Sequence, residues 1–119
     1  RNLLRAGIPT VNQTVLLKGI NDSADTIGSL CRKLVAQCIK PYYLFHGDPV
    51  SGTMHFRTGV SKGLEIMGSL QGKLSGLALP HFAIDLPGGK GKVRLGTGQC
   101  DASGQYTDYQ GSACSYPDI

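Results

Sequence analysis

The segment that decides the fold is IPTVNQTVLLKGINDSADTIGSLCRKLVAQCIKPYYLFH, which occupies residues 8–46. It opens with an uncharged, β-branched run at residues 8–17, a pattern typical of a strand that is buried on both faces. It closes with a short aromatic strand at residues 42–46. Strands of this kind belong to parallel sheets covered by helices, so we expect a βαβ unit.

The residues between these strands, 23–40, have the periodicity of an amphipathic helix. Asp22 or Ser23 is suited to accept hydrogen bonds from the first free amides, and Asp25 suits the positive end of the helix dipole. The pair Lys40-Pro41 predicts the end of the helix. The expected apolar stripe consists of Ile27, Leu30, Cys31, Leu34, Val35, Cys38 and Ile39.

The remaining segments complete an α/β pattern. A second helix fits residues 61–74, although it contains three glycines that each cost up to about 1 kcal/mol relative to alanine, so it depends on tertiary packing. From residue 77 the pattern changes to short extended pieces, which predicts a β-rich segment. Residues 1–7 resemble the end of a helix stopped by a glycine, so we expect the chain to begin inside a domain.

Length and composition limit the class of protein. The 119 residues suffice for one domain, and 40% apolar with 17% charged residues argues against an acidic disordered segment. The uncharged run at residues 74–84 contains glycine and proline, and no uncharged run of the sequence is long enough to span a membrane. The 17 glycines indicate many turns and close backbone approaches.

The charges favour a small anionic ligand over nucleic acid. Twelve basic and eight acidic side chains give a net charge of +4, and the basic cluster is confined to Lys90, Lys92 and Arg94. The cysteines show neither a Cys-x-x-Cys pair nor histidine at metal-ligand spacing, which argues against zinc or a disulfide framework. We read them as packed or incidental free thiols of a reducing, cytoplasmic protein. They are Cys31, Cys38, Cys100 and Cys114.

Two carboxylates and a glycine-rich loop are the candidate functional groups. Asp48 and Asp85 each follow a predicted strand, at residues 42–46 and 81–84, and strand ends of parallel sheets meet at one mouth. Either aspartate alone is more often a loop cap. The loop Pro-Gly-Gly-Lys-Gly-Lys, residues 87–92, exposes backbone amides that suit a phosphate, and its lysine could pair with phosphate or attack a carbonyl. It does not match a Walker A loop.

Four blocks resemble, in order, the C-terminal part of the lysine 2,3-aminomutase family: LLRAGIPTVNQTVLLKGIND (3–22), KPYYLFHGDPVSGTMHFRTGVSKGLEIM (40–67), LSGLALPHFAIDLPGGKGKV (74–93) and YTDYQGSACSYPD (106–118). The resemblance implies an isomerase in which a partial βα barrel of the TIM type holds a 4Fe-4S cluster, S-adenosylmethionine and pyridoxal phosphate. Residues 1–76 would be the last βα units of that barrel, and residues 77–119 a β-rich segment that carries the pyridoxal phosphate lysine.

The resemblance also implies roles for individual residues. Lys92 matches the lysine that forms the internal aldimine with pyridoxal phosphate, while Lys90 replaces a glycine of that motif. Asp48 and Asp85 match the carboxylates that hold the side-chain ammonium of the substrate lysine. Two anions in one pocket repel each other unless a cation joins them, which agrees with a dibasic substrate. Gln13 matches a glutamine beside S-adenosylmethionine, although a hydrogen bond at the end of the sheet explains it equally well.

The sequence also departs from the family. Its Cys-x-x-x-Cys-x-x-Cys cluster motif is absent, and we expect it upstream of Arg1, so this chain alone should be inactive and hold no metal. Residues 93–100 lack the proline that commonly follows the lysine. The roles of His55 and Arg57 stay open; Arg57 fits either an anion or a loop brace.

The implied reaction moves the amino group of L-lysine between C2 and C3, and the implied complete protein is a homo-oligomer that binds neither nucleic acid nor membrane. Two alternatives stay open. One is an aminomutase for another amino acid, or for a lysine on a translation factor. The other is a non-catalytic remnant that binds pyridoxal phosphate or phosphate.

Overall fold

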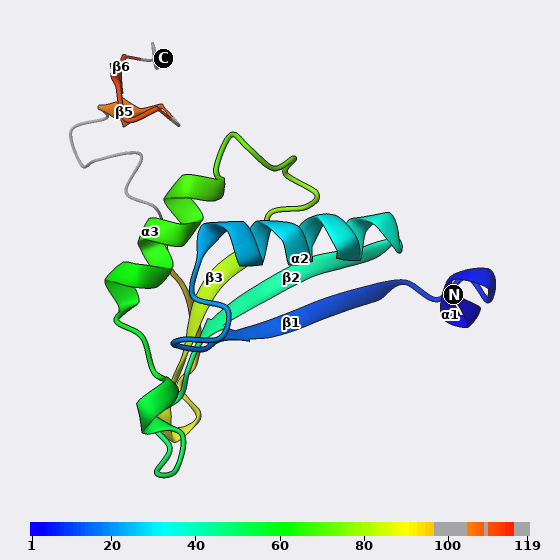
Figure 1. Cartoon of the computed structure of the whole chain (residues 1–119), viewed down its shortest axis with the longest axis horizontal. Helices are drawn as coiled ribbons and strands as arrows, with labels where there is room; N and C mark the ends of the chain where they lie inside the picture. Colours follow the sequence, from blue (N-terminus) through cyan, green and yellow to red (C-terminus); the bar gives the residue numbers. More distant parts are fainter. Residues whose placement is uncertain (97–104, 109, 116–119) are drawn as a thin grey trace.

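A computed structural model describes residues 1–96, 105–108 and 110–115 of the chain. Its main sheet has four strands in the order β1-β2-β3-β4, and β5 and β6 form a separate two-stranded sheet (Figure 1). The α/β class predicted from the sequence is confirmed. The elements are α1 (Asn2–Arg5), β1 (Thr10–Leu16), α2 (Ala24–Ala36), β2 (Ile39–His46), η1 (Met54–Phe56), α3 (Val60–Leu70), β3 (His81–Leu86), η2 (Pro87–Gly89), β4 (Gly91–Arg94), β5 (Tyr106–Thr107) and β6 (Ala113–Cys114).

The predicted βαβ unit is confirmed. Strands β1 and β2 pair in parallel, and α2 connects them and packs along β2 (Figure 1). The side chain of Ser23 caps α2 by accepting a 3.2 Å hydrogen bond from the amide of Thr26, as its position predicts. Strand β3 adds in parallel beside β2, and β4 returns antiparallel beside β3, so the sheet is mixed.

The predicted end of the first helix is wrong. Helix α2 ends at Ala36, and Cys38 takes a left-handed φ of 59°, so the pair Lys40-Pro41 lies inside β2. Pro41 has no amide proton to donate, and the register between β1 and β2 slips directly after it. The slip leaves one extra residue, Tyr42, in β2. A proline that the sequence indicates as a helix stop therefore marks an irregularity in a strand.

The main core lies on one face of the sheet, where α2 and α3 pack. Cys31 and Ile27 of α2 belong to the same buried cluster as Phe82 of β3, and Phe82 is 1% exposed. Since burying such a side chain contributes roughly 1.5–3 kcal/mol, this layer holds the helices on the sheet. The buried cluster contains Leu16, Ile27, Cys31, Leu44, Ile66, Met67, Leu70 and Phe82.

The opposite face, which we call the second face, has no helix of the described chain packed on it in this way. Val11 and Val15 of β1 lie there and are 54% and 43% exposed, so the prediction that this strand is buried on both faces is wrong. Parallel pairing was predicted correctly, but helices cover one face alone. A smaller cluster of Tyr43, Phe45 and Ala83 occupies the centre of the second face.

Two further expectations are corrected in their bounds. The second helix spans Val60–Leu70 rather than residues 61–74, because the chain turns at Gln71 and Gly72, the latter with a φ of 80°. The predicted extended pieces after residue 77 include β3, and β3 joins the main sheet beside β2. Within the described residues, no helix is long and apolar enough to cross a membrane.

Gly63 tests how α3 is seated on the sheet. A Cβ atom at this position would overlap the ring of Phe82, whereas a Cβ at Gly68 of the same helix would meet nothing within 4 Å. We predict that Gly63→Ala destabilises the fold by about 1–3 kcal/mol through overpacking. Gly68→Ala should instead stabilise it by about 0.5–1 kcal/mol. Urea unfolding followed by circular dichroism measures both, and a stabilised Gly63→Ala variant would contradict this packing.

Candidate functional site

The candidate site lies on the hairpin of β3 and β4, at the carboxyl end of the parallel strands. The turn between them contains Gly88 and Gly89, and β4 begins at Gly91; their φ angles are 74°, 71° and 90°, respectively. These left-handed conformations explain why glycine is used there. The register places Asp85 directly opposite Lys92. Asp85 was predicted to follow its strand, but it lies inside β3 because the strand extends to Leu86.

Asp85 and Lys92 form an ion pair. The Lys92 Nζ atom lies 3.9 Å from Oδ1 of Asp85, and the side chains are 47% and 46% exposed, respectively. The same Nζ atom lies 5.7 Å from the centre of the Phe45 ring. A half-exposed pair of this kind contributes at most about 1 kcal/mol to stability, so both groups can exchange partners when a ligand binds.

Beside this pair, Arg94 and two tyrosines form a second group on the second face. The Arg94 guanidinium donates a 3.4 Å hydrogen bond to the Tyr43 hydroxyl and lies 5.8 Å from the centre of the Tyr43 ring. The ring of Tyr42 lies 4.2 Å from that of Tyr43. The hydrogen bond from Arg94 lowers the pKa of Tyr43, and the interaction with Tyr43 raises the pKa of Tyr42.

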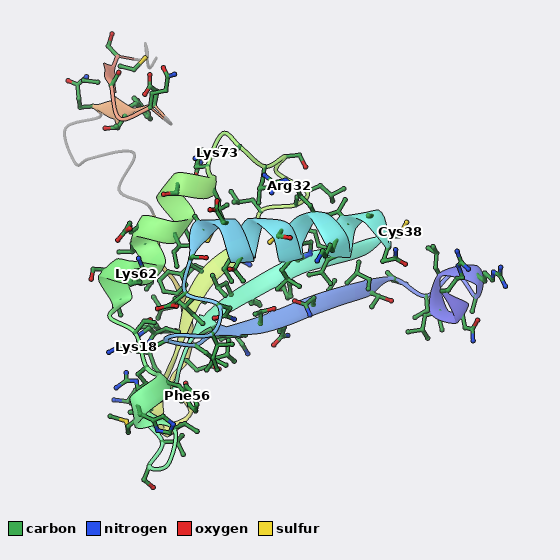
Figure 2. The ribbon with its side chains drawn as sticks, viewed as in Figure 1. Lys18, Arg32, Cys38, Phe56, Lys62 and Lys73 are labelled. Carbon is green, nitrogen blue, oxygen red and sulfur yellow. The ribbon has the colours of Figure 1, made fainter. Side chains whose placement is uncertain are left out.

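Asp48 follows β2, as predicted, but it lies in a different place. It is exposed and lines a hollow of about 390 Å³, together with Val15, Phe56 and Arg57. Figure 2 labels Phe56 at the end of the sheet far from Cys38, which precedes β2. No hydrogen bond or ion pair of the described residues links Asp48 to the Asp85–Lys92 pair.

The hollow and the ion pair nevertheless share one end of the second face. Val15, which lines the hollow, is the register partner of Phe45, and Phe45 is the ring beside Lys92. Adjacent strands of a sheet are about 4.8 Å apart, so Val15 at the hollow and Phe45 beside Lys92 are direct neighbours. A ligand that lay across Phe45 would reach from Lys92 toward Asp48.

Gln13 and Arg57 are also placed by the structure. Gln13 is exposed on the second face in the middle of β1, opposite Tyr43, and not near the end of the strand as predicted. The Nε atom of Arg57 donates a 3.0 Å hydrogen bond to the carbonyl oxygen of Gly47. Of the two roles left open for Arg57, the loop brace is therefore the observed one. The centre of the His55 ring lies 4.0 Å from that of the Phe56 ring, and the two ring planes are tilted by 43°.

The sequence placed Arg94 in a basic cluster suited to a small anionic ligand, but it did not predict the contact of Arg94 with Tyr43. The signal was the alternation within β4, because Lys92 and Arg94 are two residues apart and so share a face. Among the described cysteines, burial raises the pKa of Cys31, while Cys38 and Cys114 are exposed, and all three are free thiols. Cys100 lies outside the described residues.

The fold and the site define an α/β protein with an accessible lysine, paired with a carboxylate, at the carboxyl end of a partly parallel sheet. No family model matches the chain. It is 60% identical over 93 residues to a protein of Aquifex aeolicus named "Putative L-lysine 2,3-aminomutase", which covers 78% of the chain and 25% of that protein. It is 51% identical over 88 residues to L-lysine 2,3-aminomutase of Methanococcus maripaludis, which covers 74% of the chain and 20% of that protein.

A third relative is named for another substrate. Glutamate 2,3-aminomutase of Clostridioides difficile is 45% identical over 93 residues, which are 78% of the chain and 22% of that protein. The chain is therefore homologous to the lysine 2,3-aminomutase family over about three quarters of its own length, and the resemblance seen in the sequence is confirmed. It spans between a fifth and a quarter of the length of these relatives.

His81, beside Tyr43 on the second face, provides a pH test of this arrangement. Partial desolvation of the exposed His81 side chain, followed by the positive charges of Arg94 and Lys40, lowers the pKa of His81 below 6.5. The unfolded chain then binds the proton more readily, so stability should fall as the pH drops from 6.5 through the lower folded-state pKa.

We expect Arg94→Gln to move the His81 pKa only part of the way back toward 6.5, because the partial desolvation of His81 remains. NMR titration of the imidazole ring protons measures the change. Lys62→Gln, which removes a charge from α3, is the control and should leave the His81 pKa where it is. An unchanged His81 pKa in Arg94→Gln would show that Arg94 does not face the imidazole.

Proposed function

We propose that this chain forms the pyridoxal phosphate and substrate-ammonium part of an aminomutase that moves the amino group of L-lysine between C2 and C3. The observation that carries the proposal is the Asp85–Lys92 pair, an accessible amine 3.9 Å from a carboxylate beside a turn rich in glycine. Homology to aminomutases supports the reaction class. The chain's share of its relatives makes the activity of the whole protein part of this proposal.

The residues around Lys92 fit pyridoxal phosphate. Its Nζ atom is accessible, the ring of Phe45 lies 5.7 Å away, and the glycine turn leaves space where side chains would otherwise stand. When bound, this cofactor supplies an aldehyde that holds amines covalently and a conjugated ring that stabilises a neighbouring unpaired electron. Lys92 supplies the primary amine that holds it.

Asp85 then acquires a defined role. In the ligand-free chain its carboxylate is neutralised by Lys92. Once the Lys92 amine is committed to the cofactor, the carboxylate lacks a cation, and an ammonium of the ligand can take that place. Asp48, reached along Phe45 and Val15, would supply the second carboxylate to the same ammonium when a ligand lies across this end of the face. Two such groups favour a dibasic substrate over glutamate.

Fewer observations support the other roles that the family resemblance implies. Gln13 is exposed on the second face, which supports contact with S-adenosylmethionine there. No group of three or more potential metal ligands gathers among the residues that the structure describes, so no part of the proposal involves a cluster held by them. We also propose that the sheet is the last part of a barrel, because the outer edge of β1 has no partner strand within the described chain. The division at residue 76 belongs to the same proposal.

The position of the cofactor is tested by chemical trapping. We predict that borohydride reduction of the complete protein loaded with pyridoxal phosphate attaches the cofactor to Lys92, as located by peptide mapping. Lys92→Gln should abolish the label, and Lys90→Gln, in the same turn, should retain it. A label on Lys90 in the unchanged protein would overturn the assignment.

The role of Asp85 is tested by separating binding from stability. We predict that Asp85→Asn raises the KM for L-lysine at least about tenfold, because an ammonium loses a charged partner. The free energy of unfolding should change by less than about 1 kcal/mol, since the pair is half exposed. Glu65→Gln, which breaks the comparable exposed pair with Lys62, should leave KM unchanged. Preference of the unchanged enzyme for glutamate over lysine would contradict the proposed substrate.

A further inference from the structure

Arg94 occupies a defined position relative to Lys92. The two residues are separated by one position in β4, so their side chains leave the same face of the sheet. Their register partners on β3 are Ala83 and Asp85, respectively, and Ala83 is fully buried at the centre of the second face. Arg94 thus lies one step along the strand from the cofactor lysine of the proposed function.

The guanidinium of Arg94 is held by aromatic contacts, and no carboxylate of residues 1–96, 105–108 or 110–115 pairs with it. It donates one 3.4 Å hydrogen bond to the Tyr43 hydroxyl and lies over the Tyr43 ring, and the side chain is exposed. The ion pairs of the described residues are Lys62–Glu65 and Lys92–Asp85, so no carboxylate there reaches Arg94. A guanidinium has five N–H donors in a planar fork, and within the described part of the chain its hydrogen-bonding partners are Tyr43 and Tyr42, which leaves donors available to a ligand.

The charge balance of this face points to the kind of ligand. Lys92 and Arg94 contribute two cations, and Asp85, already paired with Lys92, contributes one anion. In the proposed function the Lys92 amine is bound to the cofactor and Asp85 pairs with an ammonium of the ligand, so the Arg94 charge has no anionic partner left among these groups. A ligand with an oxyanion would answer it, because guanidinium binds carboxylate and phosphate oxygens through paired, charge-assisted hydrogen bonds.

We propose that Arg94, oriented by Tyr43, is an oxyanion-binding residue for the ligand held at Lys92. This inference rests on the proposed function. The shared chemistry is that of a carboxylate or a phosphate monoester, which the substrate and the cofactor respectively carry. Arg94 also lies within residues 93–100, where the sequence departs from the pattern of the family it resembles, so this contact would distinguish this chain within the family.

The test compares ligands that differ only by the oxyanion. Equilibrium binding to the complete protein is measured by absorbance for pyridoxal phosphate and for pyridoxal, which lacks the phosphate. With the cofactor bound, binding of L-lysine is compared with binding of 1,5-diaminopentane, which lacks the carboxylate. The variants are Arg94→Gln, Arg94→Lys and Tyr43→Phe, and Lys90→Gln is the matched control for loss of one positive charge nearby.

Arg94→Gln should weaken the binding of one ligand that carries an oxyanion, either pyridoxal phosphate or L-lysine, about tenfold or more. Binding of the matching ligand without the oxyanion, pyridoxal or 1,5-diaminopentane, should be unchanged. If affinity falls for pyridoxal phosphate alone, Arg94 binds the phosphate of the cofactor. If affinity falls for L-lysine alone, Arg94 binds the carboxylate of the substrate. Arg94→Lys should restore part of the affinity, and Tyr43→Phe should weaken it less than Arg94→Gln does. Thermal unfolding of each variant reports whether it is folded.

Two results would overturn the inference while leaving the proposed function intact. The first is that Arg94→Gln binds each of the four ligands as tightly as the unchanged protein does. That result would mean that Arg94 only packs on Tyr43. The second is an equal loss in Lys90→Gln, which would indicate a general effect of charge. Failure of the unchanged protein to bind pyridoxal phosphate would instead remove the proposed function, and this inference with it.

Discussion

The pairing of β3 with β4 is the constraint on which the site depends. Side chains alternate between the faces of a strand, so a slip of one residue would move Asp85 and Lys92 to opposite faces. The register is set by apolar residues on the helix-covered side, where Ile84 is opposite Val93 and the neighbouring Phe82 is almost fully buried. The positive φ angles of the glycines allow the tight turn that joins β3 to β4. The ion pair is thus a consequence of packing on the other side of the sheet.

The two faces of the sheet divide stability from function. On one face, α2 and α3 bury the main core and fix the strands. On the second face, Tyr43 and Phe45 are buried beneath the long polar side chains of β4, whose charged ends stay accessible. Since the polar groups contribute little to folding, they can change partners without loss of structure. A rigid sheet with exchangeable charges at one end is what a ligand site requires.

Local chemistry determined which features could be predicted from the sequence. The Ser23 cap, the parallel strands and the glycine turn each follow from short-range signals, and all three are observed. The helix end predicted at Pro41 was wrong because a proline, which has no amide proton to donate, fits an irregularity in a strand as well as the end of a helix. The prediction that the strand containing Val15 is buried on both faces was wrong because the lack of charge in a strand does not show whether a second layer covers it.

The site itself was partly predictable for the same reason. Resemblance to a family selected Asp85 and Lys92, but their contact depends on a strand extending to Leu86, which the sequence does not signal. The place of Asp48 depends on how residues 47–57 fold over the end of β1, a matter of tertiary packing. Arg94 was predicted as one of a cluster of positive charges, but its contact with Tyr43 was not, because Tyr43 lies 51 positions away in the sequence.

The most direct measurement is a crystal structure of the complete protein with both pyridoxal phosphate and L-lysine bound. The account predicts electron density for the cofactor against Lys92 on the second face, with the side-chain ammonium of lysine at Asp85. Density for either molecule on the helix-covered side, or an ammonium far from Asp85, would contradict it.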